Sequence, residues 1–547
     1  MNIQRVLISC LSSQYIHVPL APLCLKAALE EACPSVQISI AEANINEPFD
    51  AVLDRLAGEA PDLIALCVYI WNRRETARLV RSLKALMPRV PIVVGGPEVT
   101  HDVEAVFRDM PIDYLIRGAG EVPFPSLVSA LMEDRKTEIP GVCLKNTDGS
   151  IRMATPALPP PPSPDLYTQE DFSRLGSRMI YAETSRGCPF SCAFCLSGRN
   201  EPVQQMSSEE ALSYLIRLGS SSGAGTVKLV DRTFNFHDRR TREILQGLIH
   251  ARVKGQIPDV CYHMEVAADL FSKEALELLA TAPRGLFQME AGLQSFHAKT
   301  LDACNRHTDM ERLEHNLRTI LEPGNIHLHI DLIAGLPEED FETFGVSFDR
   351  AFHIHPHQLQ LGTLKLIPGS ALRERDWGQI FQPDPPYEVL STPWISYPEL
   401  ARLRQAAEVV EKVWNSGRFR ESISCIVDSG TRSFDLFLSL GHVLGTQSLK
   451  PARYAEAIYK EAMQRGIPDA LIRTHLILDW LSFDNTGTLP PFLRPDRIPP
   501  ERLKSWKTAH PGAPRPRVAL LPSGRIALAV WEKVDPVTLR GKVEFLT

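Results

Sequence analysis

The sequence predicts an α/β protein in three parts: a doubly wound parallel sheet, a partial barrel of strands and helices, and a mainly helical region. Three observations support this prediction. Short apolar runs alternate with helical patterns from residue 4 to about 133 and again from about 178 to 375, as in parallel sheets with crossover helices. A proline-rich segment separates the two series. Long amphipathic patterns dominate beyond about residue 382.

Length and composition limit the class of protein. At about 150 residues per domain, a chain of 547 residues should form three or four domains. A composition of 44% hydrophobic and 23% charged residues excludes bulk disorder and fibrous repeats. With 59 basic and 66 acidic residues, the net charge of -7 gives no global basic field for a nucleic acid or an anionic membrane.

The same survey predicts a cytoplasmic protein. No apolar run approaches the roughly 18 residues that cross a bilayer, and the first residues are too polar for a secretory signal. Eleven cysteines scattered over so long a chain do not resemble a disulfide framework. We therefore expect reduced thiols or metal ligation.

The first series of elements predicts a doubly wound domain over residues 1–140. Its helical patterns lie near residues 21–33, 73–87 and 122–133, where apolar residues recur at three- and four-residue spacing. The expected strands are residues 4–10, 36–43, 62–69, 91–96 and 114–117. In such a domain the ligand binds outside the carboxyl ends of the strands.

Residues 141–176 are expected to form a linker, because the segment TPALPPPPSPDLY at 155–167 cannot be a helix or a central strand. Residues 177–380 then predict a (β/α)6-type partial TIM barrel. Its strands are expected at residues 179–185, 226–230, 260–266, 285–290, 326–335 and 359–367. Residues 381–547 predict a mainly helical accessory domain that ends in a hairpin, with its turn at Pro522, Ser523 and Gly524.

Three cysteines follow the first strand of the predicted barrel. Cys188, Cys192 and Cys195 have the spacing C-x3-C-x2-C, which can hold a [4Fe-4S] cluster and leave its fourth iron open to another ligand. The alternative is a zinc knuckle, but structural zinc sites use four ligands, commonly two paired C-x2-C hooks, and no second hook follows. We therefore interpret the loop as an iron–sulfur site.

With Phe194 in its aromatic slot, this loop resembles that of the radical S-adenosylmethionine (SAM) superfamily. DRTFN at 231–235, EAGLQS at 290–295, NRHT at 305–308, DLIAGLPEED at 331–340 and LKLIPGS at 364–370 resemble that superfamily's later barrel motifs, in order. The resemblance implies that SAM chelates the open iron. It also implies cosubstrate contacts, with methionine and ribose held by four residues and adenosine approached by a glycine turn: Asp231, Glu290, Gln294, Ser295 and Gly335.

For two carboxylates a structural role stays open: Glu290 and Asp331 could pair with Arg306 or cap a helix. His327 and His329 alternate along one strand and share a face of the sheet. Because we find no carboxylate or cysteine at matching spacing, we interpret them as polar strand-end residues or substrate contacts rather than metal ligands.

A doubly wound domain directly before such a barrel resembles the cobalamin-binding module of one radical SAM subclass. The general signature Asp-x-His-x-x-Gly, Ser-x-Leu, Gly-Gly is matched in part, with a tyrosine and a leucine in place of the carboxylate and the first glycine. The resemblance implies cobalamin contacts at the strand ends, namely Tyr15, His17, Cys67, Tyr69, Trp71, Gly95, Gly96, Gly118, Gly120 and Glu121. Packed loop residues are the alternative for His17 and Trp71.

The resemblance implies three cofactors: a [4Fe-4S] cluster, SAM and cobalamin. The function that it implies is methyl transfer from SAM, by way of methylcobalamin, to a carbon of a small-molecule substrate, with an external electron donor such as flavodoxin or ferredoxin. We expect neither a membrane nor a nucleic acid as partner. Two alternatives stay open: a cyclase, ring-contraction or rearrangement enzyme with the same cofactors, and a cobalamin-binding sensor or carrier.

Overall fold

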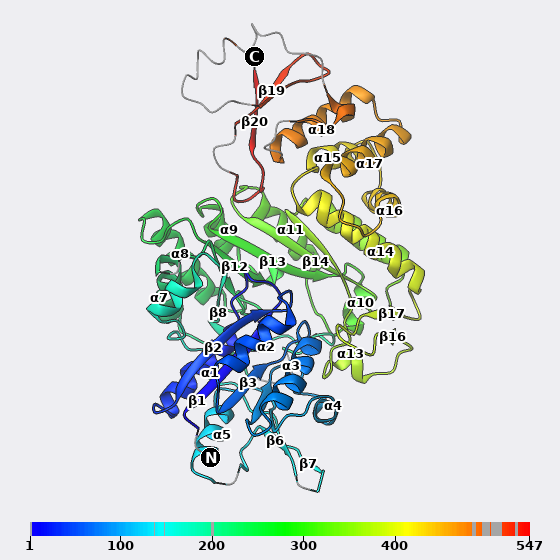
Figure 1. The fold of residues 1–547 in the computed structure, drawn as a ribbon. Coiled ribbons are helices and arrows are strands. Elements are labelled where there is room, and N and C mark those ends of the chain that lie inside the picture. Colours follow the sequence, from blue (N-terminus) through cyan, green and yellow to red (C-terminus); the bar gives the residue numbers. More distant parts are fainter. Residues whose placement is uncertain are drawn as a thin grey trace. The chain divides into compact units, whose positions relative to one another are not determined.

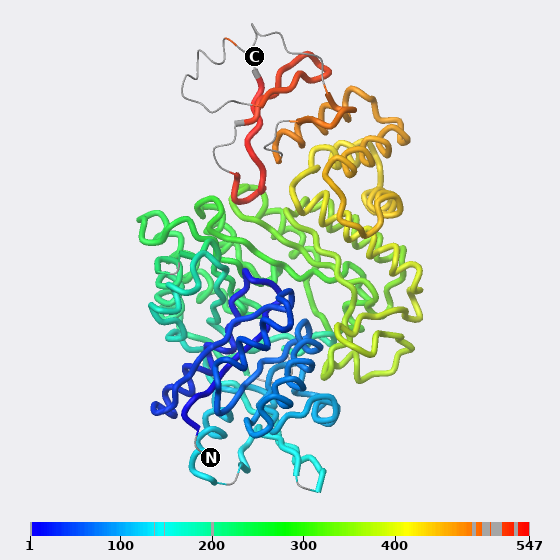
Figure 2. Tube along the Cα trace, viewed as in Figure 1, coloured from blue at the N-terminus to red at the C-terminus, as the bar shows by residue number. Residues whose placement is uncertain are grey.

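The computed structural model describes residues 3–135, 137–146, 148–197, 202–221, 223–483, 488–494, 504, 517–530 and 534–546. The chain divides into two compact units, which Figures 1 and 2 colour from blue at the amino terminus to red at the carboxyl terminus. Unit 1 comprises residues 1–265, 365–376 and 381–388, and unit 2 comprises residues 266–364, 377–380 and 389–547. The predicted barrel therefore contributes strands to both units. Within the described ranges, no helix is long and apolar enough to cross a membrane.

Unit 1 begins with a seven-stranded sheet in the order β2-β1-β3-β4-β5-β6-β7. The first five strands are parallel, β6 and β7 are antiparallel, and β1 to β5 lie where the apolar runs predict them. β6 and β7 extend the sheet beyond residue 140, where the sequence predicts the linker. The strands are β1 (Arg5–Ser12), β2 (Gln37–Asn44), β3 (Leu63–Cys67), β4 (Ile92–Gly95), β5 (Tyr114–Ile116), β6 (Val142–Lys145) and β7 (Ile151–Arg152).

Helices cover both faces of this sheet, as a doubly wound fold requires (Figure 1). They are α1 (Leu20–Ala32), α2 (Phe49–Gly58), α3 (Arg73–Leu86), α4 (Val103–Asp109) and α5 (Pro123–Met132). One apolar core joins the sheet to α2, α3 and α4, and another joins it to α1 and α5. The sequence predicts α1, α3 and α5 but not the shorter α2 and α4.

The rest of unit 1 carries the first half of the predicted barrel, with parallel strands in the order β12-β11-β8. As predicted, residues 158–167 form neither helix nor strand. A capping box of Thr168 and Asp171 starts the following helix, α6. The elements are α6 (Gln169–Leu175), β8 (Ile180–Ala182), β9 (Ser185–Arg186), β10 (Gln204–Gln205), α7 (Ser208–Ser221), β11 (Thr226–Leu229), α8 (Asp238–Val253), β12 (Cys261–Val266) and the later α13 (Ala371–Glu374).

Unit 2 carries the second half, with parallel strands in the order β15-β14-β13. All six barrel strands thus form where the sequence predicts them. The elements are a 3₁₀ turn (Ala268–Leu270), α9 (Lys273–Ala280), β13 (Phe287–Gln294), α10 (Ala298–Ala303), α11 (Met310–Leu321), β14 (His327–Ala334), α12 (Phe341–Phe352) and β15 (Gln358–Thr363).

Beyond the barrel, the chain is mainly helical, as predicted. Two short strands, β16 (Ile380–Phe381) and β17 (Val389–Ser391), precede α14 (Tyr397–Val409), which continues as a π-helical segment (Val410–Asn415). The remaining helices are α15 (Arg420–Asp428), α16 (Ser433–Leu444), α17 (Pro451–Gln464), α18 (Asp469–Phe483) and a 3₁₀ turn (Pro491–Leu493).

The predicted carboxyl-terminal hairpin forms from β18 (Arg517–Leu520) and β19 (Ile526–Val530), and β20 (Lys542–Leu546) adds a third strand that the sequence analysis misses. The loop before β20 returns to the start of β14. There the carbonyl oxygen of Val537, which is fully buried, lies 2.7 Å from Nδ1 of His327. Asp535 forms a bidentate ion pair with Arg284 at 2.6 and 2.9 Å. This returning loop thus closes one end of the sheet in unit 2.

Candidate functional site

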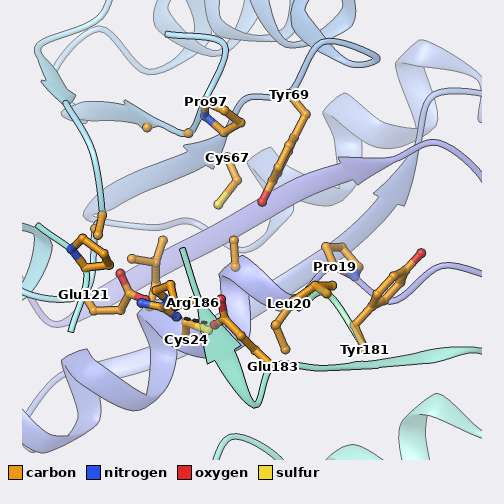
Figure 3. A pocket seen from close by; sticks show the side chains of 18 of the residues that line it. Pro19, Leu20, Cys24, Cys67, Tyr69, Pro97, Glu121, Tyr181, Glu183 and Arg186 are labelled. Carbon is orange, nitrogen blue, oxygen red and sulfur yellow. Dashed lines mark hydrogen bonds and ion pairs between the residues drawn. The ribbon is translucent and has the colours of Figure 1, made fainter. Parts of the chain in front are cut away.

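A cavity of about 760 Å³ in unit 1 collects the residues predicted to bind cobalamin (Figure 3). Its volume lies within the range of cofactor pockets, and it opens at the carboxyl ends of the sheet strands, where a doubly wound fold binds ligands. Its lining includes nine of the ten predicted residues: His17, Cys67, Tyr69, Trp71, Gly95, Gly96, Gly118, Gly120 and Glu121.

Tyr15 is the exception. It lies outside this lining, is 70% exposed, and stacks its ring on the guanidinium of Arg178 at 5.0 Å. The cation–π contact holds the ring at the surface of the loop rather than in the cavity. We therefore correct the predicted role of Tyr15: it does not help to form this wall.

His17 is held by a residue that the sequence analysis missed. The hydroxyl group of Tyr181, on β8, lies 2.8 Å from Nδ1 of His17. Burial, together with the charge of Lys228, lowers the pKa of His17, so its imidazole is neutral at pH 7. Tyr181 thus supplies the orienting contact for which the sequence offered no carboxylate. No local pattern could have revealed it, because 164 residues separate the two side chains.

Two aromatic residues form a flat platform on the cavity wall. The rings of Tyr69 and Trp71 stack with centroids 4.5 Å apart and an angle of 7° between their planes. The indole nitrogen of Trp71 donates a hydrogen bond to the carbonyl oxygen of Leu11 at 3.1 Å, which fixes the ring although it is 42% exposed. This platform suits the face of a planar macrocycle.

The two glycines after β4 have different roles. Gly96 has φ +117°, and a Cβ atom there would lie 2.5 Å from the carbonyl oxygen of Val68, so the backbone itself requires glycine. A Cβ atom at Gly95 would make only an ordinary contact, 3.5 Å from Ile116. Because Gly95 lines the cavity and tolerates a Cβ atom sterically, its missing side chain leaves room for a ligand. The residues present therefore fit a bulky cofactor such as cobalamin.

Arg186 joins the first domain to the strand before the cysteine loop. Its Nη1 lies 2.6 Å from Oε1 of Glu121, and its Nη2 lies 2.5 Å from Oε2 of Glu183 (Figure 3). The three side chains are 14 to 17% exposed, and burial raises the pKa of Glu183 although Arg186 opposes this effect. The arginine thus neutralises two buried carboxylates on the cavity wall.

We expect Arg186→Met to lower the free energy of unfolding by about 3 kcal/mol, because breaking a buried ion pair leaves uncompensated charge. Arg186→Lys keeps the charge but loses the bidentate fork, so its effect should be intermediate. Chemical unfolding of the cofactor-free protein measures both. The control is Arg239→Met, since Arg239 is 88% exposed in its pair with Glu243. Equal losses at Arg186 and Arg239 would contradict this assignment.

The three predicted cluster ligands are free thiols of intermediate exposure on one loop after β9. The N–H of Cys195 donates to the carbonyl oxygen of Cys192 at 3.0 Å, and this turn holds Phe194. The N–H of Ser197 donates to Sγ of Cys195 at 3.4 Å, a kind of contact that also tunes iron–sulfur clusters.

The spacing of these sulfur atoms bears on the zinc alternative. Among the described residues, the one group of three candidate ligand atoms that all lie within 4.8 Å of one another is Glu290, His329 and Asp331, not the cysteines. Four ligands around one zinc ion at 2.3 Å would bring sulfur atoms closer together. The wider spacing fits a four-iron cluster, and the residues present therefore fit this group.

Asp231 has a structural position. It is fully buried, and it accepts hydrogen bonds from the N–H of Thr184 at 2.7 Å, the Thr184 hydroxyl at 2.6 Å and the Ser185 hydroxyl at 2.7 Å. Burial raises its pKa, and these donors lower it in part. The carboxylate thus anchors the segment that leads to the cysteine loop. This corrects its predicted role as a cosubstrate contact.

The other predicted SAM contacts lie in unit 2, on and after β13 and β14. Glu290 lines the partly exposed face of β13, Gln294 ends the strand at φ +72°, and Gly335 turns the chain after β14 at φ +89°. Ser295 is fully buried, and its hydroxyl donates to Oε1 of Glu339 at 2.5 Å. Ser295 therefore positions the turn of Glu339, which corrects its predicted role as a direct contact.

Glu339 should make the stability of the protein depend on pH. Burial raises its pKa to about 7, although the Ser295 and Ser347 hydroxyls lower it in part. The folded state thus favours the neutral carboxyl group, whose stabilisation is complete below the usual pKa of 4.5 and is lost as pH rises through about 7. At about 1.4 kcal/mol per pKa unit, Glu339→Gln should remove about 3 kcal/mol of the change in unfolding free energy between about pH 5 and pH 8. Chemical unfolding at both pH values measures it.

The control for Glu339 is Glu322→Gln, at an exposed glutamate. This variant should leave the pH dependence unchanged. A Glu339→Gln protein with the parent's pH dependence would show that another group is responsible.

Three family models match the chain. The B12 binding domain matches residues 6–128, the Radical SAM superfamily matches residues 182–351, and a protein of unknown function (DUF4080) matches residues 375–510. The first two models thus cover the cavity strands and the cysteine loop.

Curated relatives match the same region. The chain is 26% identical over 351 residues to "Cobalamin-dependent radical SAM methyltransferase TokK" of Streptomyces tokunonensis, which covers 60% of this chain and 50% of the relative. It is 24% identical over 323 residues to the anaerobic magnesium-protoporphyrin IX monomethyl ester cyclase of Rubrivivax gelatinosus, covering 56% of this chain and 57% of the relative. The chain thus spans about half the length of these relatives.

A solved structure shares the fold. The cobalamin-dependent SAM radical enzyme OxsB, with aqua-cobalamin bound, superposes with a TM-score of 0.62 at 13% identity. The match covers 88% of this chain and 79% of the other. It confirms the predicted succession of a doubly wound domain, a barrel domain and a helical region.

Proposed function

We propose that this chain, which carries a B12-binding domain followed by a radical SAM domain, is a cobalamin-dependent radical SAM methyltransferase. It moves a methyl group from SAM, by way of cobalamin, to a carbon atom of a small-molecule substrate. One observation carries the proposal. The cavity at the strand ends of the first domain is also lined by Gly187, Leu196 and Ser197, which flank the cysteine loop.

In this proposal the chain's own residues bind and orient. Cys188, Cys192 and Cys195 hold the cluster through three of its irons. The Tyr69–Trp71 platform and the space at Gly95 hold the corrin ring. When bound, the cluster and SAM supply a radical that removes a hydrogen atom, and cobalamin supplies the methyl group. The protein fixes their distance and excludes water from the cavity.

The overall reaction balances with an external reductant. Each turnover consumes two SAM molecules and two electrons, exchanges one substrate C–H bond for C–CH3, and releases 5′-deoxyadenosine, methionine and S-adenosylhomocysteine. The hydrogen atom lost by the substrate appears in 5′-deoxyadenosine. A small electron-transfer protein such as flavodoxin or ferredoxin is the proposed donor. All eleven cysteines are free, which suits a reducing compartment such as the cytoplasm.

A second candidate keeps the same cofactors without methyl transfer. The similarity to a cyclase, at 24% identity over 323 residues, supports it. A cyclase would use the hydrogen abstraction but consume no second SAM molecule. The two candidates therefore differ in their products.

Mass spectrometry separates them without a known substrate. Anaerobic protein, reconstituted with iron, sulfide and cobalamin, is given reductant and SAM with a deuterated methyl group. The methyltransferase should give 5′-deoxyadenosine, S-adenosylhomocysteine and a deuterated methyl group on cobalamin. The matched control is the same protein with Cys188, Cys192 and Cys195 replaced by Ala.

Two outcomes would contradict methyl transfer. Release of 5′-deoxyadenosine with unlabelled cobalamin would favour the cyclase. Bound cobalamin without either product would favour a sensor or carrier.

A further inference from the structure

The sheet of unit 2 has one unusually polar face. Along β13 and β14, every second residue points to the same side, and the register pairs Glu290 with His329 and His329 with Gln358. One residue row further on, Gly292, Asp331 and Gln360 are aligned. The side chains of this polar face are Gln288, Glu290, His329, Asp331, Gln358 and Gln360.

The opposite face is an ordinary core. Met289, Ala291, Leu328, Ile330 and Leu359 are at most 1% exposed. Parallel sheets are normally apolar on both faces, and barrel interiors are filled by branched aliphatic side chains. A face of carboxylates, amides and an imidazole does not form a packed core, so we interpret it as a binding surface.

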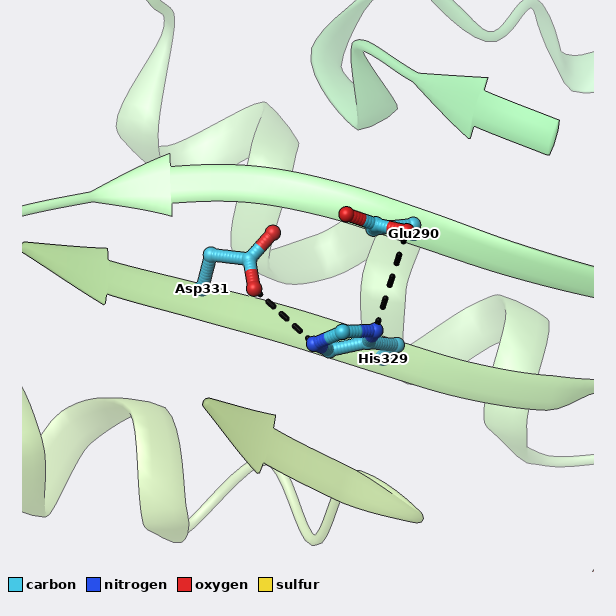
Figure 4. A group of neighbouring side chains, drawn as sticks. All are labelled: Glu290, His329 and Asp331. Carbon is cyan, nitrogen blue, oxygen red and sulfur yellow. Dashed lines mark ion pairs between the residues drawn. The ribbon is translucent and has the colours of Figure 1, made fainter. Parts of the chain in front are cut away.

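His329 lies at the centre of this polar face, between two carboxylates (Figure 4). Its Nε2 lies 2.9 Å from Oδ1 of Asp331, and its Nδ1 lies 3.9 Å from Oε2 of Glu290. The histidine is 6% exposed, whereas the carboxylates are 18 and 21% exposed. The imidazole is therefore buried behind groups that a ligand can reach.

We propose that His329 is a positioning residue that holds Asp331, and more loosely Glu290, as acceptors for a ligand with hydroxyl or ammonium groups. Two carboxylates beside one imidazole leave the polar face acidic or neutral. It accepts hydrogen bonds from diols and amines, and it repels phosphate groups and hydrocarbon. The inference rests on the proposed function, because SAM brings both a ribose diol and an ammonium group, although a hydroxylated or aminated substrate offers the same chemistry.

Three substitutions at one position separate positioning from general packing. A Gln side chain can place its amide nitrogen where Nε2 lies, an Asn side chain can place it where Nδ1 lies, and Leu offers neither. Because the contact to Asp331 is the shorter one, His329→Gln should restore binding and His329→Asn should not. A residue that only fills space would give no such difference.

The test is equilibrium binding of SAM, and separately of adenosine, to the anaerobic cluster- and cobalamin-loaded protein. For at least one ligand, His329→Leu and His329→Asn should weaken binding about tenfold or more, the effect of losing a hydrogen bond to a charged group. His329→Gln should stay within about threefold of the parent. Cobalamin absorbance should be unchanged in all three variants, because the cobalamin cavity lies in unit 1.

Several outcomes would overturn the inference. Equal binding by all variants, or rescue by Asn rather than Gln, would remove His329 from the positioning role. So would a parent that binds neither ligand, or one divalent metal ion per chain lost on Asp331→Asn, which would show a metal site instead. Adenosine binding that depends on His329, in a parent that cannot cleave SAM, would defeat the proposed function but not this inference.

Discussion

Cys192→Ala is expected to reduce formation of 5′-deoxyadenosine by at least about a thousandfold, because the variant cannot retain the cluster and residues that act as one unit fail together. Iron content should fall from about four atoms per chain toward zero. Cobalamin binding should persist, since the three cysteines do not line the cavity. Iron analysis, visible spectra and product quantification on one anaerobic preparation measure all three effects.

Cys425→Ala is the matched control, because Cys425 is also a free thiol of intermediate exposure, on α15. It should keep both iron and activity. A Cys192→Ala protein that still releases 5′-deoxyadenosine would remove this loop from the mechanism.

Gly95→Leu is expected to weaken cobalamin binding by about 100-fold or more, because a large side chain in a fitted cavity costs about 1–3 kcal/mol and displaces the ligand. The backbone should tolerate the change, since a Cβ atom at Gly95 lies 3.5 Å from its nearest neighbour, Ile116. Titration with cobalamin, followed by its visible spectrum, measures the affinity. Thermal unfolding without cobalamin should match the parent.

Two other glycines make this prediction specific. Gly58→Leu adds the same side chain where no atom lies within 4 Å, and it should bind cobalamin normally. Gly96→Ala should instead destabilise the fold, because its Cβ atom would meet the Val68 carbonyl oxygen. Normal cobalamin binding by Gly95→Leu would place the cofactor elsewhere.

The sequence predicts the strands well because their pattern is local. Buried parallel strands are short continuous apolar runs, and all five runs of the first domain and all six of the barrel form strands. The helices α2 and α4 were missed because they have only ten and seven residues, too few for a clear helical period. β6 and β7 are antiparallel additions that no crossover pattern announces.

The site was predicted best where the backbone defines it. Strand-end glycines and the cysteine spacing are visible in one segment, and nine of ten predicted residues line the cavity. Tyr181 and Arg186 were missed because their partners, His17 and Glu121, lie 164 and 65 residues away. Fold topology, not local pattern, brings these side chains together.

The histidines of β14 show the same limit. The sequence analysis found no carboxylate suitably spaced from His329, yet Glu290 lies beside it through the register of two parallel strands, and Asp331 follows on the same face. The register of strands 39 residues apart cannot be read from the sequence. Asp231 and Ser295 failed in the opposite sense, because motif residues at strand ends can serve the backbone rather than a ligand.

The returning loop before β20 has a consequence for how the chain matures on the ribosome. His327 is made 210 residues before Val537, which it contacts. At about 5 to 20 residues per second, β14 waits about 10 to 40 seconds for this neighbour. During that interval the start of the strand has no cover from Val537, so a nascent-chain chaperone has a defined time and place to act.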